Sequence, residues 1–176
     1  VLVTASLTSA GNATITSADD TDLLLVRSTG ADISVTAADA ANATTLTAAG
    51  AIGVDGASSD VGTATAGTSL AMLARSGQLT LGTGTAGTTA DLTKQGATGT
   101  LQATTLTSGG DATITSSTDS SLGIVTSTGG NIVVDTVGAT DAGTLDAAAA
   151  IDVDSGSAII DTADAGTSLT VLARSG

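Results

Sequence analysis

Aliphatic residues recur along the chain at regular intervals, most of them within one short repeated pattern. In this pattern an aliphatic residue is followed by three small or polar residues and then by Gly, as in residues 7–11 and 26–30. After most of these glycines apolar and polar residues alternate, as they do around Ile33 and Val35. Alternation with a period of two is typical of a strand that buries one face. The pattern therefore predicts strand, glycine turn, strand and a second, looser turn.

The aliphatic residue of each pattern is an anchor from which coil lengths follow. The successive anchors are Leu7, Val26, Leu46, Leu73, Leu92, Leu106, Val125, Leu145 and Leu172. Their mean spacing is about 20 residues, within the range of solenoid repeats. The expected structural anchors, with their glycines and following strand residues, are Leu7, Gly11, Ile15, Val26, Gly30, Ile33, Leu46, Gly50, Ile52, Leu73, Gly77, Leu106, Gly110, Ile114, Val125, Gly129, Ile132, Leu145, Ile151 and Leu172.

Three steps between anchors depart from this mean. The two long steps, which start at Leu46 and Leu145, contain residues 56–69 and 155–168, and we expect these segments to bulge outward or to add a strand. The one short step starts at Leu92 and contains residues 96–105. It indicates either a compressed coil or a wrong choice of anchor at Leu92.

A longer repeat contains these coils. The phrase LTSAGNATITS at residues 7–17 returns as LTSGGDATITS at residues 106–116, and residues 1–77 align with residues 100–176 without a gap. Because loops normally tolerate insertions, gapless alignment indicates that most of each copy is structural. We expect residues 1–99 to form a first super-repeat of five coils and residues 100–176 a second, incomplete one, in one continuous solenoid.

Stacking explains how such short units could fold. A unit of about 20 residues cannot bury its own apolar side chains, but it can do so against the next unit. We therefore predict an all-β fold, a right-handed parallel β-helix (β-solenoid) with coils of about 20 residues in a 99-residue super-repeat. Nine coils at the usual strand spacing would form a rod of about 40 Å.

The 99-residue period also fits a string of immunoglobulin-like sandwiches. That fold has a buried Trp and a hallmark Tyr, and the chain contains neither, nor any Pro for long loops. A sandwich also has no need of a shorter period within each domain. The solenoid is therefore the favoured architecture.

Composition and charge limit the partners. The chain contains no aromatic residue, Pro, Cys or His, and its net charge is −13 with only four basic residues. Nucleic acid and anionic membrane surfaces would both repel such a chain, and its apolar runs are too short to span a bilayer. We expect neither nucleic-acid binding nor membrane insertion.

Catalysis and metal binding have few candidate residues. Without His or Cys, the usual nucleophile–base pairs and transition-metal sites cannot form. Two Asp residues could cleave a glycosidic bond, but no aromatic residue is present to hold a sugar. We therefore expect no enzyme, no catalytic or cofactor-binding residue and no metal site, with solvated turn carboxylates as the favoured interpretation of the Asp residues. The weak candidates for Ca²⁺, the one cofactor considered, are Asp19, Asp20, Asp22, Asp55 and Asp154.

Polar residues that follow the coil glycine recur in both copies. They are Asn12 and Asp111 at one position, and Asp32 and Asn131 at the next. Asn and Asp favour turns because their side chains hydrogen-bond nearby backbone groups. Turn chemistry is therefore the expected role of all four.

Three of the basic residues raise separate questions. Arg75 and Arg174 occupy the same place in the two copies. Each could neutralise an Asp of a neighbouring coil, in a surface pair worth at most about 1 kcal/mol, or contact a second rod; both interpretations stay open. Lys94 has no counterpart within the chain.

A Thr-x-Thr ladder on a flat solenoid face can order water, which is the ice-binding arrangement. Residues 14–16 read Thr-Ile-Thr, but the equivalent residues 32–34 and 51–53 read Asp-Ile-Ser and Ala-Ile-Gly. Because the ladder is not kept from coil to coil, these strands argue against ice binding.

Several coil sequences resemble a known family. The phrases LTSAGNATITS, STGADISVTA, LTAAGAIGVDG and LARSGQLTLGT are similar to the coils of filamentous haemagglutinin-like exoproteins, large bacterial adhesins exported by two-partner secretion. The resemblance covers nearly the whole chain and implies a right-handed β-helix on the cell surface. The family's N-terminal secretion domain is not visible here. The strict 99-residue super-repeat is more regular than is usual in this family and could instead mark a sheath, fibre or surface-layer protein.

Together these observations favour a structural role. We expect an extracellular, cell-surface repeat segment that acts as the rigid shaft of a bacterial adhesin or fibre. The alternatives are a self-assembling sheath or surface-layer fibre and a polysaccharide-acting β-helix enzyme. The expected partners are neighbouring repeats of the same chain, with lateral contact between copies in the fibre alternative. Because the chain starts at Val1 and stops within the phrase LARSG, we expect a longer parent protein that continues with residues resembling 78–89.

Overall fold

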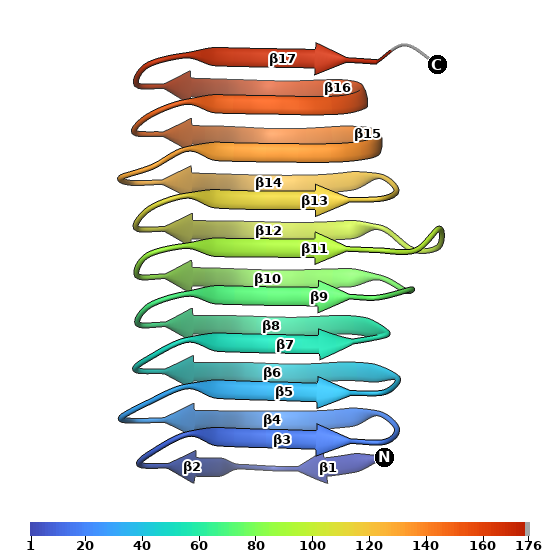
Figure 1. Ribbon diagram of the computed structural model, residues 1–176, viewed down its shortest axis with the longest axis vertical. Helices are drawn as coiled ribbons and strands as arrows, with labels where there is room; N and C mark the ends of the chain where they lie inside the picture. Colours follow the sequence, from blue (N-terminus) through green and yellow to red (C-terminus); the bar gives the residue numbers. More distant parts are fainter. Residues whose placement is uncertain (175–176) are drawn as a thin grey trace.

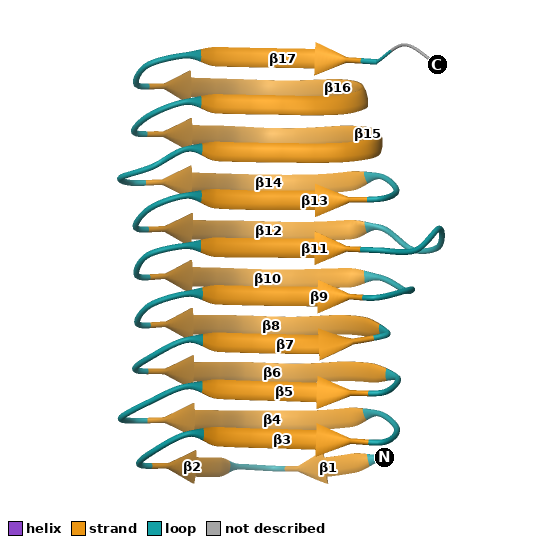
Figure 2. Cartoon of the chain, viewed as in Figure 1, coloured by secondary structure: helices purple, strands orange, loops and turns teal. Residues whose placement is uncertain are grey.

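The computed structural model, which describes residues 1–174, is an all-β parallel solenoid of about nine coils, each of roughly 20 residues. Strands joined by short turns make up the described chain, with no helix among residues 1–174 (Figure 2). The strands of each coil lie directly over those of the coil before, so that the molecule is a straight stack (Figure 1). The predicted fold class is confirmed, and its right-handed sense stays a prediction.

The strands lie on two opposite faces, which we call face A and face B. Every pairing between successive coils is parallel, which excludes the immunoglobulin-like alternative because a sandwich is antiparallel. Face A consists of β3 (Ala13–Ser17), β5 (Ile33–Ala37), β7 (Ile52–Gly56), β9 (Leu70–Ala74), β11 (Ala90–Lys94), β13 (Ala112–Ser116), the first parts of β15 (Ile132–Ala147) and β16 (Ile151–Ala165), and β17 (Leu169–Ala173). Face B consists of β1 (Leu2–Thr4), β2 (Leu7–Ser9), β4 (Thr21–Ser28), β6 (Ala40–Ala48), β8 (Ser58–Ala66), β10 (Leu79–Ala86), β12 (Leu101–Ser108), β14 (Ser120–Ser127) and the second parts of β15 and β16.

The register defines the true coil lengths. One inward column on face B runs through Leu23, Ala43, Val61, Leu81, Ala103 and Leu122. The coils are nearly equal in length: the shortest step joins Ala43 to Val61 and the longest joins Leu81 to Ala103. The column takes five steps from Leu23 to Leu122, and the expected long and short steps are wrong.

The error has a simple cause. Leu46 and Leu106 lie on face B, whereas Leu73 and Leu92 lie on face A. Strands on both faces carry the same alternation and are followed by turns of similar composition. The sequence therefore did not indicate that successive anchors lie on different faces. The suspicion that the anchor at Leu92 was misplaced is correct.

The three segments whose path the sequence did not settle lie in regular strands and turns of the solenoid. Residues 56–69 contain β8 and residues 155–168 lie mainly in β16; both continue face B and neither bulges from it. Residues 96–105 contain most of the turn at residues 95–100 and the start of β12. The coil that contains this turn is the longest, not a compressed one.

Inward-facing side chains form continuous columns between the two faces. The predicted anchors Ile15, Val26, Ile33, Leu46, Ile52, Leu106, Ile114, Val125, Ile132, Leu145 and Ile151 are all buried. Leu7 is half-buried against the core at the first coil. Two anchors are wrong: Leu73 points outward and is partly exposed, and Leu172 is 53% exposed in β17.

Glycines in the turns allow close stacking of the backbone. A Cβ at Gly110 would lie 2.8 Å from the Thr88 carbonyl oxygen, and Cβ atoms at Gly30 and Gly129 would also meet a carbonyl oxygen of the preceding coil. Their φ angles are not positive; among the described residues only Gly96 and Gly99 have positive φ. Of the two roles that glycine can have in a turn, lack of room for Cβ is the one that applies here.

Face B bends along a line parallel to the rod. In each face-B pairing one residue is skipped in the register, for example Leu24 opposite Thr44 and Gly62 opposite Gly82. The bend divides face B into two facets. The second facet presents two outward residues per coil, such as Thr83 and Thr85 of β10.

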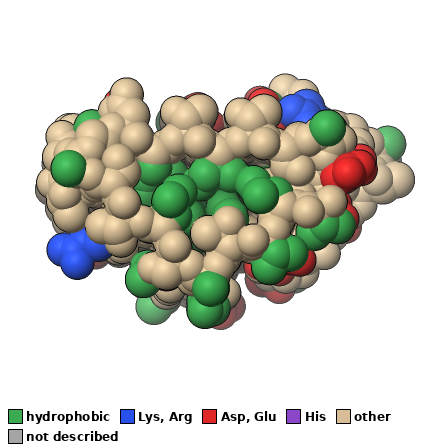
Figure 3. All heavy atoms as spheres, turned by 90° about the horizontal axis from the view of Figure 1, so that it is seen from below, with side chains coloured by type: hydrophobic (Ala, Val, Ile, Leu, Met, Phe, Trp, Pro, Cys, Tyr) green, Lys and Arg blue, Asp and Glu red, His purple; other side chains and the backbone are tan. Residues whose placement is uncertain are grey.

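The ends of the stack leave the core uncovered. At the first coil apolar side chains lie open in the centre of the cross-section (Figure 3), and Leu2 and Val3 are 38% and 71% exposed. At the last described coil Leu169 and Val171 are exposed as well. Both ends of the described stack are therefore apolar surfaces bordered by unpaired strand edges.

Candidate functional site

The acidic residues near the start of the chain do not converge on one point. Asp19 lies 3.5 Å from the N-terminal amine, the Asp20 carboxylate accepts a hydrogen bond from the Ala40 amide (3.0 Å), and Asp22 accepts one from the Asn42 side chain (3.0 Å). Each carboxylate thus has a different partner. Within residues 1–174 no group of three or more Asp residues is arranged to hold a metal ion.

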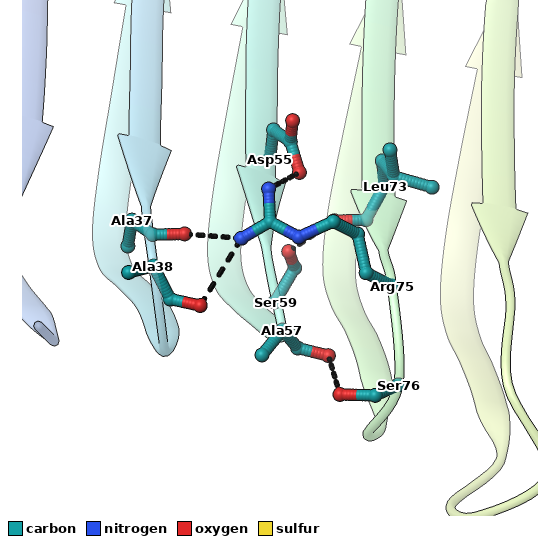
Figure 4. Close-up of polar contacts among 8 residues, drawn as sticks. All are labelled: Ala37, Ala38, Asp55, Ala57, Ser59, Leu73, Arg75 and Ser76. Atoms are coloured by element: carbon teal, nitrogen blue, oxygen red, sulfur yellow. Dashed lines mark hydrogen bonds and ion pairs between the residues drawn. The ribbon is translucent and has the colours of Figure 1, made fainter. Parts of the chain in front are cut away.

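The other two calcium candidates belong to arginine clusters. The Arg75 guanidinium donates to the Asp55 carboxylate (Nη1 to Oδ1, 2.7 Å) and to the carbonyl oxygens of Ala37 (2.6 Å) and Ala38 (3.1 Å) (Figure 4). Asp55 is in the preceding coil and Ala37 in the coil before it. Arg75 therefore joins three successive coils.

Arg174 has the equivalent place in the second copy and also joins three coils, but through two carboxylates. Its guanidinium contacts the Asp154 carboxylate and lies 3.4 Å from Asp135, two coils away. The hydrogen bond to Asp154 raises the pKa of Arg174 above its ordinary value. Of the two interpretations that the sequence left open, pairing with an Asp of a neighbouring coil is the one observed.

The Asn and Asp residues after the coil glycine connect coils to one another. The Asp32 side chain accepts a hydrogen bond from the Ala51 amide (2.7 Å), and Asp111 accepts one from the Asn131 amide (2.8 Å). Asn131 in turn accepts one from the Ala150 amide (3.0 Å). The expected hydrogen bond from each side chain to its own turn is wrong, because the partner lies in the next coil.

Lys94 is the largest exception to the repeated core. It is the last residue of β11, its side chain points inward with 1% exposure, and its neighbours in the column are the small residues Ala74 and Ser116. Its Nζ donates to the Gly96 carbonyl oxygen (2.8 Å), and no carboxylate of residues 1–174 forms an ion pair with it. Burial lowers the pKa of Lys94.

The long turn after Lys94 provides the space for its side chain. The turn projects beyond the other turns on that side of the rod (Figure 1), and it contains Gly96 and Gly99 with φ of 79° and 77°. Thr98 donates to the Ser76 carbonyl oxygen and Thr118 to that of Gly99, both at 2.7 Å. The turn is thus held from the coils on both sides.

A shallow hollow on face A contains two carboxylates. The residues that line it include Gly53, Ala71, Asp55 and Asp91. Asp55 is paired with Arg75, and Asp91 accepts a hydrogen bond from the Thr93 hydroxyl at 2.9 Å. Neither carboxylate is buried, so this hollow lacks the dry environment that raises the pKa of a glycosidase acid.

The most regular outward surface lies on the second facet of face B. Four consecutive strands, β6, β8, β10 and β12, each present the sequence Thr-x-Thr, and the register aligns the four pairs. We call this surface the threonine facet; its residues are Thr45, Thr47, Thr63, Thr65, Thr83, Thr85, Thr105 and Thr107.

Sequence reasoning missed this facet because it compared only the strands after Gly11, Gly30 and Gly50, which lie on face A. There the register places Thr14 beside Ser34 and Ser34 beside Gly53, so no threonine ladder forms. The signal on face B was a Thr-x-Thr at residues 45–47, 63–65, 83–85 and 105–107.

No segment of residues 1–174 forms a helix of the length and hydropathy that crossing a bilayer requires. None of the protein-family models, curated proteins and solved structures compared with the chain matches it. The fold thus defines a class, the parallel β-solenoids, and no family within it.

Proposed function

We propose that the chain is a rigid structural segment, the shaft of an extracellular bacterial adhesin or fibre. The observation that supports this proposal is the unbroken parallel ladder that joins every coil to the next along the whole described stack. In a solenoid, stability is the sum of each coil and its contacts with the two neighbouring coils. Length and stiffness then follow directly from the number of coils.

The contacts between coils suit a load-bearing rod that is exposed to proteases. Backbone hydrogen bonds run along the rod axis, and the clusters around Arg75 and Arg174 each tie three coils together. Short turns leave little backbone free to enter a protease, which needs a locally unfolded segment. Negative charge distributed over the surface keeps a long rod soluble.

The open ends support the self-assembling fibre as a second candidate. Apolar residues such as Val3 and Val171 are exposed beside unpaired strand edges at opposite ends of the described stack. Such edges are templates for pairing with another chain. In this alternative, copies of the segment would join end to end into the fibre. We regard a polysaccharide-acting enzyme as less favoured, because the carboxylates in the hollow on face A are solvated and already paired.

Small-angle X-ray scattering combined with limited proteolysis tests the shaft. We expect a monodisperse rod of about 40 Å, with cleavage confined to the two ends and the turn at residues 95–100. Negative-stain microscopy at increasing protein concentration separates the two candidates. Fibres that form as the concentration rises would favour the self-assembling fibre over the shaft. Rapid cleavage at many internal turns would contradict both.

A further inference from the structure

The threonine facet forms a two-dimensional net. Within a strand the two threonines are separated by one residue, which corresponds to about 6.6 Å, and neighbouring coils are about 4.8 Å apart. The register holds four rows in line without a gap, with Thr45, Thr63, Thr83 and Thr105 in one column. The second column, 47, 65, 85 and 107, continues to Thr126 of β14.

The net is flat. Sheets normally twist, and flat ones are associated with stacking and with regular side-chain ladders. Here the strands of successive coils remain parallel along the entire stack, with no visible rotation from β2 to β17 (Figure 1). The positions of the threonines therefore repeat by translation alone, as positions in a crystal do.

The side chains of the facet are available and preorganised. All eight are at least partly exposed, and none of their hydroxyls has a hydrogen-bond partner among residues 1–174. A hydroxyl has one donor and two acceptor sites for water. The β-branched side chain restricts χ1, so that an ordered layer of water loses little threonine side-chain entropy when it forms.

The facet is also neutral in a strongly acidic molecule. Its eight positions carry no charge, whereas the chain has a net charge of −13. The rows that border it differ: Leu25 and Arg27 precede it in β4, and Ile124 follows it in β14. A charged side chain imposes its own hydration geometry, and its absence leaves only evenly spaced hydroxyl and methyl groups.

We propose that the threonine facet binds ice, with its two columns matched to water molecules in the prism plane of hexagonal ice. The two spacings of the net are close to the two oxygen repeats of that plane, and hydroxyl groups can replace water as hydrogen-bond partners in both directions. Methyl groups between the hydroxyls exclude loosely ordered water. This activity goes beyond the proposed shaft function and does not depend on it.

Thermal hysteresis, ice-crystal shaping and partition into a slowly growing ice hemisphere test the proposal on the full chain. The wild type should show all three. Thr65→Lys combined with Thr85→Lys places two charged side chains in the centre of the net and should abolish them. The matched control is Thr14→Lys combined with Thr113→Lys, which makes the same change at outward positions of face A and should behave as the wild type.

A second variant tests the net by completing it. Only Ile124, Asp146 and Asp164 interrupt the two columns in the next three coils, because Thr126, Thr144 and Thr162 already occupy the other positions. Ile124→Thr, Asp146→Thr and Asp164→Thr together extend the net from four rows to seven and should increase the hysteresis.

Circular dichroism and the melting temperature establish that each variant is folded before its ice activity is compared. The proposal is overturned if the folded wild type leaves ice crystals round and is excluded from the ice hemisphere. It is also overturned if the face A control loses as much activity as the facet variant, or if the completed net gains none.

Discussion

Many outward residues of face B differ between the two copies, whereas most inward residues of the same strands are identical. Leu46 and Leu145 occupy equivalent buried positions, and both are 0% exposed. One residue further on, Thr47 of the first copy is replaced by Asp146 in the second, and Thr65 by Asp164 in the same way. The backbone path thus depends on the inner columns, and the outer columns are free to change.

This division has a physical reason. Inward side chains must fill a narrow space between two faces at the density of a crystal, which limits their volume. Outward side chains contact mainly water and the equivalent residue of the next coil. One solenoid can therefore carry a neutral net on one part of its surface and acidic columns on another.

The largest effect is expected from the shared core. Leu46→Ala and Leu145→Ala should each lower the free energy of unfolding by about 2–5 kcal/mol, because each leaves a cavity between two well-packed coils. If the copies are equivalent inside, the two costs should agree closely. Chemical denaturation followed by circular dichroism measures both, and a much smaller cost at Leu145 would break the comparison.

A smaller loss of stability is expected from adding a side chain at Gly84, a core position that has none. A Cβ at Gly84 would lie 2.7–3.0 Å from methyl carbons of Leu81, Leu106 and Leu70, which fill the space above it. Gly84→Val should therefore cost about 1–3 kcal/mol by overpacking. The control is Gly53→Val on the outer side of face A, where nothing lies within 4 Å of the new Cβ. Equal melting temperatures of the two variants would contradict the prediction.

Lys94 lies within residues 78–99, the part of the first copy that has no counterpart in residues 100–176. Lys94→Met should raise the free energy of unfolding by about 1 kcal/mol at neutral pH, because a buried unpaired ammonium is replaced by an apolar chain. The Gly96 carbonyl oxygen keeps the Ser117 hydroxyl as a donor after the change.

The pH dependence of this variant has a defined sign. Burial lowers the pKa of Lys94 from 10.5, so that between the lowered value and 10.5 the unfolded chain binds more protons and wild-type stability rises with pH. The advantage of the Met variant should therefore shrink as the pH rises toward 10.5. Thermal melts over this range measure the difference, and a constant advantage would show that the ammonium is not the cause.

The Arg75 cluster should make a small contribution to stability. Arg75→Met should cost about 1 kcal/mol, since the ion pair is partly exposed and the carbonyl hydrogen bonds supply most of the effect. Arg27→Met is the matched control, because Arg27 is exposed and has no partner among residues 1–174. Hydrogen exchange of the Asp55 and Ala57 amides separates a local effect from a global one. If their exchange changes no more than the drop in melting temperature implies, the variant lowers only the overall stability.

The smallest effect concerns the outer columns themselves. Asp146 and Asp164 are register partners in adjacent coils, and like charges in that position are destabilising. Asp164→Thr should therefore stabilise the chain by roughly 0.2–1 kcal/mol at low salt, and the gain should fall at high salt as the repulsion is screened. A gain that does not depend on salt would exclude charge repulsion as the reason.

Much of the core could be predicted from residue patterns alone. Alternation identified Ile15, Ile33 and Ile114 as inward residues, because a strand with one buried face needs no information from elsewhere in the chain. Leu73 was misplaced for the same reason: an outward Leu on one face and an inward Leu on the other look alike over a short stretch. Burial of Lys94 was not foreseen, since it depends on a long turn that gives the side chain room.

Alternation, turn glycines and the gapless 99-residue alignment were sufficient to specify a stacked parallel β-solenoid with coils of about 20 residues. These features are local, because each coil meets the same packing requirement as its neighbours. Which residues share a column depends instead on the length of the turn between the faces, which varies from none in β15 and β16 to the whole of 95–100. The four threonine pairs, at 45–47, 63–65, 83–85 and 105–107, are unevenly spaced in the chain. Only the folded turns absorb this unevenness and bring the pairs into line.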